Sequence, residues 1–272
     1  MNLLEIMDGR LTRIISPDKL IGSLVLPDSV TEIGDYAFSG CTALASIVIP
    51  DSVTVIGEAA FFGCTGLTTI AVPGSVTDIG NGAFAACVNL MQLTVDNANA
   101  AYCSEDNIIY TKDKKSLVAV AAGLKDSIVI PNTVSEIRRH AFSGCSSLTS
   151  IKLPSCITKI GICVFSRCTS LTGVTIPDTV NVIGPFAFSE CTFLTDVIIP
   201  DSVREIHFFA FSKCTGLTNI VIPDSVTSIG GNAFEEINPN AHFTVKSESV
   251  KELLVNSGSH IQDEQITVEP SL

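Results

Sequence analysis

The amino-acid sequence predicts a repeat solenoid, a fold in which short coils of similar sequence stack on one another. Three features support this prediction: evenly spaced prolines, an isoleucine and a phenylalanine at fixed distances from each proline, and alternating apolar residues just before it. The prolines stand 23 residues apart within two runs, which are Pro27, Pro50 and Pro73, and then Pro131, Pro154, Pro177, Pro200 and Pro223. Because one such repeat cannot bury its own apolar face, the coils must stack to form a core.

The segment before each proline has the pattern of a half-buried strand. Leu44, Ile47 and Ile49 precede Pro50, and residues that alternate between apolar and other types favour a strand with one buried face. The proline ends the strand because it has no N–H to donate to a ladder. Stacked coils therefore predict a parallel sheet with strands about 4.8 Å apart.

The segment after each proline supplies the rest of the core. The isoleucines stand six residues after the prolines and the phenylalanines eleven residues after them: Ile33, Ile56, Ile79, Ile137, Ile160, Ile183, Ile206, Ile229, and Phe38, Phe61, Phe84, Phe142, Phe165, Phe188, Phe211, Phe234. Glycine follows most of these isoleucines, and we expect unusual backbone dihedral angles there. The stretch through the phenylalanine is too short for an amphipathic helix, so we expect a helical or 3₁₀ turn opposite the strand.

Seven of the ten cysteines form a column in the repeat, fourteen residues after the proline: Cys41, Cys64, Cys87, Cys145, Cys168, Cys191 and Cys214. Seven cysteines cannot all pair within one column, and the position is that of a small buried apolar residue. We therefore expect free thiols, which mildly favour a reducing or anaerobic setting.

These residues resemble the leucine-rich repeats of the bacterial surface antigen, or BspA-like, type. The shared pattern LxxIxIPxSVxxIGxxAFxxC runs over about residues 20–245. The resemblance implies an α/β repeat fold: a right-handed leucine-rich-repeat solenoid with a parallel β-sheet on its concave face and short helical or 3₁₀ turns on the convex side. It also implies adhesion or protein–protein recognition by surface proteins of host-associated microbes. A fold does not determine a function, however.

We expect a single solenoid over residues 1–272, with three irregular parts. Residues 1–26 are expected to form an N-terminal cap coil, residues 96–126 an expanded coil with a hairpin insert, and residues 247–272 a cap of one helix and one strand. The insert is either an expanded coil typical of the family or the mark of a binding face. Ser249 and Glu252 have the spacing of a capping box and predict the helix start.

The composition limits the partners. With 16 basic and 28 acidic residues the net charge is −12, which argues against nucleic acid and anionic membranes as ligands. No stretch approaches the length of a membrane span. The opening segment MNLLEIMDGR has no apolar run long enough for a signal peptide, so a cytoplasmic location is the alternative to the surface or secreted location that the resemblance implies.

The exposed strand positions are the first candidate for a partner-binding site. They come in pairs along the expected concave face: Ser46 and Val48, Thr69 and Ala71, Gln92 and Thr94, Ser150 and Lys152, Gly173 and Thr175, Asp196 and Ile198, Asn219 and Val221. Solenoids often bind ligands on this face. The alternative is an ordinary solvated sheet face, because the positions hold few charges or aromatic anchors.

An apolar strip is the second candidate. Eight and nine residues after the proline, successive coils carry Ile162 with Cys163, Pro185 with Phe186, and Phe208 with Phe209, and His140 precedes them in the same row. If exposed, these residues would form a partner or dimer site. Alternatively, their side chains fold back onto the turns.

Catalysis and metal binding have little support in the sequence. His140, His207, His242 and His260 lie in different coils or in the tail, and no catalytic or nucleotide-binding motif is present. The aspartates that follow prolines are Asp28, Asp51, Asp178, Asp201 and Asp224; they could bind Ca²⁺, but Pro-Asp turn chemistry explains them better. We predict a non-enzymatic module without a cofactor or metal that binds a host or bacterial surface protein. The alternative is an intracellular scaffold, and a homodimer is a weaker possibility.

Overall fold

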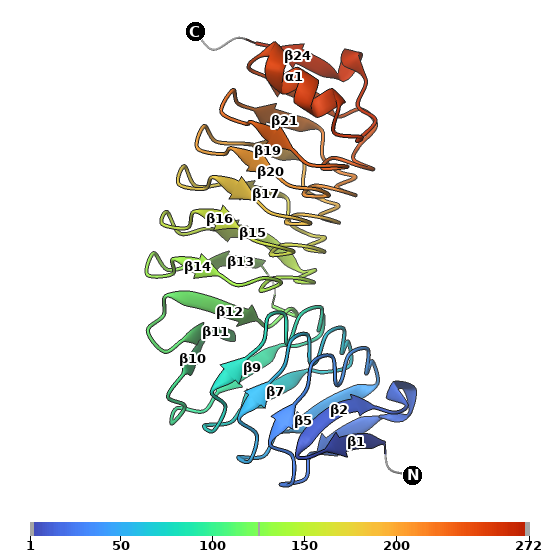
Figure 1. Ribbon diagram of the computed structural model, residues 1–272, viewed down its shortest axis with the longest axis vertical. Helices are drawn as coiled ribbons and strands as arrows, with labels where there is room; N and C mark the ends of the chain where they lie inside the picture. Colours follow the sequence, from blue (N-terminus) through green and yellow to red (C-terminus); the bar gives the residue numbers. More distant parts are fainter. Residues whose placement is uncertain (1–2, 125, 270–272) are drawn as a thin grey trace. The chain divides into compact units, whose positions relative to one another are not determined.

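The computed structural model describes residues 3–124 and 126–269, and its contacts divide the chain into two compact units (Figure 1). The first unit comprises Met1–Leu124 and Arg138–Cys145, and the second comprises Lys125–Ile137 and Ser146–Leu272. Each unit is a β-solenoid in which a regular coil contributes one longer strand and one strand of two residues. This confirms the predicted leucine-rich-repeat solenoid.

In the first unit the longer strands form one parallel sheet and the short strands join a second sheet (Figure 1). The first sheet contains β3 (Gly22–Val25), β5 (Leu44–Val48), β7 (Thr69–Val72) and β9 (Gln92–Val95). The second contains β1 (Leu4–Met7), β2 (Arg10–Ile14), β4 (Glu32–Ile33), β6 (Val55–Ile56) and β8 (Asp78–Ile79). A 3₁₀ turn, η1 (Pro17–Lys19), lies between β2 and β3.

The second unit repeats this arrangement. Its longer strands, in sheet order, are β13 (Asp126–Val129), β15 (Leu148–Lys152), β17 (Gly173–Thr175), β19 (Asp196–Ile198), β21 (Asn219–Ile222), β23 (His242–Val245) and β24 (Ile266–Val268). Its short strands β16 (Lys159–Ile160), β18 (Val182–Ile183), β20 (Glu205–Ile206) and β22 (Ser228–Ile229) form the second sheet, and β14 (Glu136–Ile137) is a further short strand outside that sheet. Paired residues in regular coils are 23 positions apart, as in Ile160 with Ile183, so the sequence period is also the sheet register.

The core consists of the predicted columns. The eight repeat phenylalanines are buried, and their rings stack between neighbouring coils: Phe38 and Phe61 lie 4.9 Å apart and nearly parallel, as do Phe188 and Phe211 at 5.2 Å. All ten cysteines are free, which confirms the prediction, and the seven of the column are buried. The thiol also bonds across coils, since Cys64 Sγ donates to the Phe38 carbonyl at 3.0 Å. A buried thiol therefore serves as both an apolar filler and a weak donor.

The segment opposite the strands differs from the predicted helical or 3₁₀ turn, because it is a series of hydrogen-bonded turns. Its N–H groups alternate between two kinds of acceptor: Ala37 N donates to Gly34 O within the coil, whereas Tyr36 N donates to Glu58 O of the next coil. Tyr36 adopts a left-handed conformation with φ of 56°, which allows this alternation. The turns thus stack by backbone hydrogen bonds as strands do.

The glycines that follow the isoleucines do not adopt the unusual backbone dihedral angles that we predicted for them. Gly57 does not have a positive φ, but a Cβ atom there would lie 2.6 Å from the Asp35 backbone nitrogen. Close approach of neighbouring coils, and not an unusual dihedral angle, therefore requires glycine at this position.

The insert after β9 is an antiparallel meander of β10 (Tyr102–Glu105), β11 (Ile108–Thr111) and β12 (Ser116–Val120). Side chains of the insert, together with Arg138 from the coil after it, take the place of a regular following coil as hydrogen-bond partners. Tyr102 Oη accepts from Ile79 N at 3.1 Å, and Arg138 Nη1 donates to Ile79 O at 2.9 Å. The buried Asn99 side chain donates to the carbonyls of Pro73 and Val76. These side chains thereby satisfy backbone groups of β8 and of the segment before it that a regular coil would otherwise pair.

The second unit closes with α1 (Glu248–Val255), the 3₁₀ turn η2 (Asp263–Gln265) and β24, which pairs parallel to β23. Ser247 is the N-cap of α1 and accepts from Val250 N, so the predicted capping role of Ser249 is wrong. Val250 and Leu254 are the buried residues of the helix.

Candidate functional site

The strands of the second unit place the predicted partner-binding residues in two rows on one exposed sheet face. Ser150, Gly173, Asp196 and Asn219 are successive partners in the parallel register and form the first row. The second row lies two residues further along each strand and consists of Lys152, Thr175, Ile198 and Val221. The residues between the rows, such as Val197, point into the core. We call this surface the strand face of the second unit.

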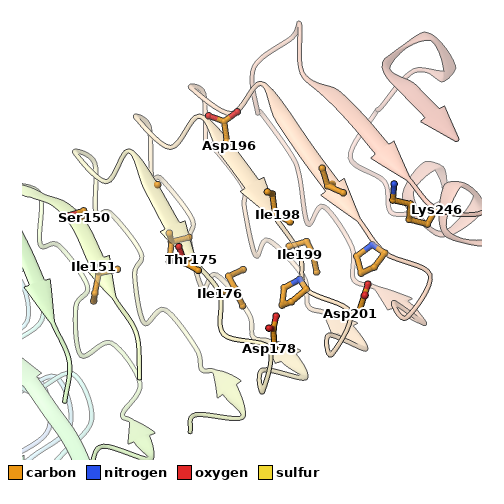
Figure 2. Close-up of a pocket in the computed structure, with 15 residues that line it drawn as sticks. Ser150, Ile151, Thr175, Ile176, Asp178, Asp196, Ile198, Ile199, Asp201 and Lys246 are labelled. Carbon is orange, nitrogen blue, oxygen red and sulfur yellow. The ribbon is translucent and has the colours of Figure 1, made fainter. Parts of the chain in front are cut away.

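A groove of about 800 Å³ crosses this strand face (Figure 2). The predicted residues Ser150, Gly173, Thr175, Asp196, Ile198 and Val221 all line it. Gly173 contributes to the hollow because it has no side chain and a Cβ atom there would meet nothing within 4 Å. Ile198, which is 69% exposed, presents an apolar surface within the groove.

Carboxylates flank the groove at both ends of its strands (Figure 2). Asp196 begins β19, whereas Asp178 and Asp201 follow the prolines just beyond the strand ends. Lys246 also lines the groove, and its Nζ lies 3.4 Å from Glu269 Oε2. Three carboxylates against one partly paired ammonium make the groove acidic.

Hydrogen bonds hold Asp196 in its charged form. Its two carboxylate oxygens accept from Thr195 Oγ1 at 2.6 Å and from Asn219 Nδ2 at 2.7 Å. These bonds, with the one from Thr195 the stronger influence, lower the pKa of the Asp196 carboxyl below its usual value. The charge at this end of the groove is therefore fixed in place.

The polar groups of the groove are the hydroxyls of Ser150 and Thr175, the carboxylates of Asp178, Asp196 and Asp201, and the ammonium of Lys246. They border the apolar side chain of Ile198. An apolar centre between charged ends is a common design of protein-binding surfaces.

The first unit has a matching strand face with different side chains. Ser46, Thr69 and Gln92 form one row and Val48, Ala71 and Thr94 the other, and none of these residues is charged. Ser46 Oγ donates to Ser23 Oγ of the preceding coil at 2.8 Å. This face is a plain polar and β-branched surface.

The residues of the predicted apolar strip lie together on the turn side of the second unit. Phe186 and Phe209 stack at 5.0 Å, and Phe208 packs edge-on against both rings. Phe208 is 44% exposed, whereas Ile162, Cys163, Phe186 and Phe209 are partly buried. Both expectations therefore hold in part: the rings of the strip pack on one another over the turns, and they still leave an apolar surface exposed to solvent.

The other candidate groups remain separate. Within residues 3–124 and 126–269, no three His, Cys, Asp or Glu side chains are grouped so that they could hold a metal ion. His207 Nε2 lies 3.1 Å from Glu205 Oε2, and His242 Nε2 lies 2.9 Å from Thr267 Oγ1. None of the described helices is long and apolar enough to cross a membrane.

Sequence reasoning missed the contribution of Asp178, Asp201 and Lys246 to the groove. Pro-Asp turn chemistry explains the two aspartates better than a Ca²⁺ site does, but a residue that follows a strand-closing proline also stands at the edge of the strand face. Lys246 directly follows β23, so its place after a strand was the available signal.

Comparison with known proteins gives one family and several structural neighbours. The sequence model of the BspA type leucine rich repeat region matches residues 18–116 and 123–248 in six copies. A leucine rich cell surface protein from Faecalibacterium prausnitzii A2-165 is similar in structure, with 31% sequence identity, a TM-score of 0.78, and coverage of 89% of this chain and 63% of its own length. The chain thus spans less than two thirds of that protein.

The pneumococcal vaccine antigen PcpA also has a similar fold, with 23% identity, a TM-score of 0.74, and coverage of 92% of this chain and 68% of its own length. At this identity the likeness concerns the fold alone. No curated protein matches the chain significantly.

Proposed function

Because the chain belongs to the BspA-type leucine-rich repeat family, we propose that it is a non-enzymatic binding module of a bacterial surface protein, with a role in adhesion or protein–protein recognition. The groove on the strand face of the second unit is the observation that carries this proposal. The cell-surface description of the related Faecalibacterium prausnitzii protein supports the location. The partner is a protein of the host or of a bacterial surface.

The groove indicates the chemistry of that partner. Ile198 offers an apolar contact, and Asp178, Asp196 and Asp201 surround it with negative charge. A complementary surface would present an apolar side chain flanked by lysine or arginine. Charge pairs at the rim of an interface weaken with salt, so binding should fall as ionic strength rises.

The test is binding of the labelled, purified chain to cultured epithelial cells, measured by flow cytometry. We expect saturable binding that disappears when the cells are first treated with protease, that weakens in high salt, and that falls at least tenfold in Ile198→Asp. Because the side chain of Ile198 is exposed, we expect the variant to fold, and a melting curve checks this. Equal binding of the folded variant and the wild type would refute the assignment of the groove.

The runner-up is an intracellular scaffold that uses the same groove. The ten free cysteines favour it, because thiols persist in reducing compartments. The two locations can be distinguished by treating intact cells of the source organism with a protein-labelling reagent that cannot cross the membrane. A labelled chain supports the surface role. An unlabelled chain that is released only on lysis supports the scaffold.

Self-association through the apolar strip is a further, weaker proposal, carried by the exposed edge of Phe208. Sedimentation equilibrium of the wild type and of the double variant Phe186→Ser, Phe209→Ser tests it. A dimer that dissociates in the variant supports the interface, whereas monomers in both contradict it.

A further inference from the structure

The turn side of the first unit has a recess of about 210 Å³ that the strand face does not involve. It lies over one row of left-handed turn residues, which we call the turn row: Tyr36, Ala59, Gly82 and His140. Backbone hydrogen bonds place Tyr36, Ala59 and Gly82 on successive coils, since Tyr36 N donates to Glu58 O and Ala59 N donates to Asn81 O. His140 stands next to Gly82, because a Cβ atom on that glycine would lie 3.1 Å from the His140 Cβ.

The recess exists because two small residues stand between two rings. In the equivalent row of the second unit, large side chains follow one another, and Phe186 and Phe209 stack at 5.0 Å. In the first unit Ala59 and Gly82 occupy the corresponding middle positions and leave the space open. The backbone conformation is the same in both rows, with φ of 50° at Ala59 and 54° at Phe186. Side-chain size alone therefore accounts for the hollow.

Aromatic rings form much of the wall of the recess. Tyr36 and His140 stand at the two ends of the row, and Phe62 adds a third ring from a position that is serine or alanine in most other coils. The faces of such rings carry partial negative charge and attract cations. Tyr36 is 57% exposed, so its ring is accessible to a ligand.

One carboxylate in the wall lacks a counter-charge. Among the described residues, Glu58 forms no ion pair, although it lines the recess. Its neighbour Asp35 is occupied, because it accepts from the Glu58 backbone N–H at 2.8 Å and lies 3.6 Å from Arg10 Nη2. Burial lowers the pKa of His140, Glu58 acts in the opposite direction and Arg139 in the same one, and the net lowering favours the neutral imidazole. The recess thus has one negative charge and three rings.

The backbone around the recess offers few free hydrogen-bonding groups. The carbonyls of Glu58, Asn81 and Ala59 already accept from Tyr36 N, Ala59 N and Phe62 N. The polar groups of the wall are therefore mainly the side chains of Tyr36, Glu58, Asn81 and His140. A methylated ammonium group needs no hydrogen-bond partner, since it combines a positive charge with an apolar surface, and it suits the rings and the Glu58 carboxylate.

From these features we propose that the recess bounded by Tyr36, Glu58, Phe62 and His140 binds a quaternary ammonium group. The ring faces and the Glu58 carboxylate would surround the cation, and Ala59 and Gly82 would provide the floor. The volume is below that of pockets for drug-sized ligands, so we expect it to hold one small head group. This site is independent of the strand-face groove and of the partner proposed for it.

The test compares three small alcohols that differ only in their head group: choline, ethanolamine and the uncharged isostere 3,3-dimethylbutan-1-ol. Binding to the whole chain is followed by NMR titration of the ligand resonances. Because the protein has no tryptophan, the tyrosine fluorescence of the exposed Tyr36 gives a second readout. We expect saturable choline binding with a Kd on the order of 1 mM and at least tenfold weaker binding of the other two.

Two variants and one control locate the site. Glu58→Gln keeps the shape of the wall and should weaken choline binding at least tenfold while leaving 3,3-dimethylbutan-1-ol unaffected. Ala59→Phe should abolish choline binding by filling the recess, and the second unit shows that this turn accepts phenylalanine. Glu236→Gln, at an exposed glutamate of the second unit, should have no effect.

Three results would overturn the proposal. Equal binding of choline and its uncharged isostere would reduce the site to an apolar recess, and tighter binding of ethanolamine would mean that hydrogen bonds to a primary ammonium dominate. Unchanged choline binding in Glu58→Gln would show that the Glu58 carboxylate does not contribute to binding of the cation. This last result remains informative even if Ala59→Phe fails to fold.

Discussion

The strand faces of the two units share a backbone but differ in what they present. In the first unit the exposed rows hold uncharged residues such as Ser46, Val48 and Thr69. In the second unit the same rows hold Asp196 and Gly173, and a groove crosses them. The regular coils of both units follow the same register of 23 residues. The difference shows that the repeat determines the scaffold, while a few exposed substitutions determine where a ligand can bind.

Substitutions in the core, where the two units are alike, should cause the largest losses in the free energy of unfolding. Phe188→Ala and Phe61→Ala each remove a fully buried ring that stacks on both neighbours, so each should lower the free energy of unfolding by about 3–5 kcal/mol. Denaturant unfolding of both variants checks this. A loss below about 1 kcal/mol in either variant would contradict the stacked core.

A smaller effect is expected at Gly173, where the faces differ most. Glycine weakens a strand, and this position has space for a side chain, so Gly173→Val should raise the free energy of unfolding by about 1 kcal/mol. The same change should partly fill the groove and weaken cell binding. Thermal unfolding and the cell-binding assay together check both results. A destabilised variant would show that the space at Gly173 is not available.

The smallest expected effect is on how the free energy of unfolding depends on pH in the acidic range. Because the pKa of Asp196 is lower in the folded state than its unfolded value of about 3.9, the carboxylate stabilises the fold above that pH, and this contribution disappears as the pH falls through the folded pKa. Asp196→Asn should therefore flatten the pH dependence between pH 5 and 2 slightly, as about 3.9 lies within that window. Ser46→Ala, in the first unit, should leave it unchanged. Identical pH profiles for wild type and Asp196→Asn would contradict the inferred role of the Thr195 and Asn219 bonds.

The regular part of the fold could be predicted because the same physical demand recurs in every coil. The columns of phenylalanine and cysteine are buried throughout, and the isoleucine column is buried except at Ile229, which is partly exposed. The free thiols agree with the column that the cysteines form. Details that depend on contacts between coils were not predictable in this way. Gly57 is required by the backbone of the preceding coil, and the conformation of Tyr36 by hydrogen bonds to the next coil.

The candidate site was predictable only in part, for a similar reason. Alternation identified the exposed positions Asp196 and Ile198, because side-chain direction follows strand period. It did not show that Asp178, Asp201 and Lys246 border the same groove, since these residues lie beyond the strands. Likewise, the row from Tyr36 to His140 crosses the insert, so its continuity could not be inferred from a fixed period.

The most direct test of partner recognition by the second-unit groove compares cell binding by two matched double variants, one on each strand face. Thr175→Arg, Ile198→Asp changes adjacent coils of the second unit, and Ala71→Arg, Val48→Asp makes the equivalent changes in the first. We predict at least a tenfold loss of binding for the first variant, less than a twofold change for the second, and unchanged melting temperatures for both. Loss of binding in the first-unit variant alone, or equal losses in both, would contradict the assignment of partner recognition to the groove of the second unit.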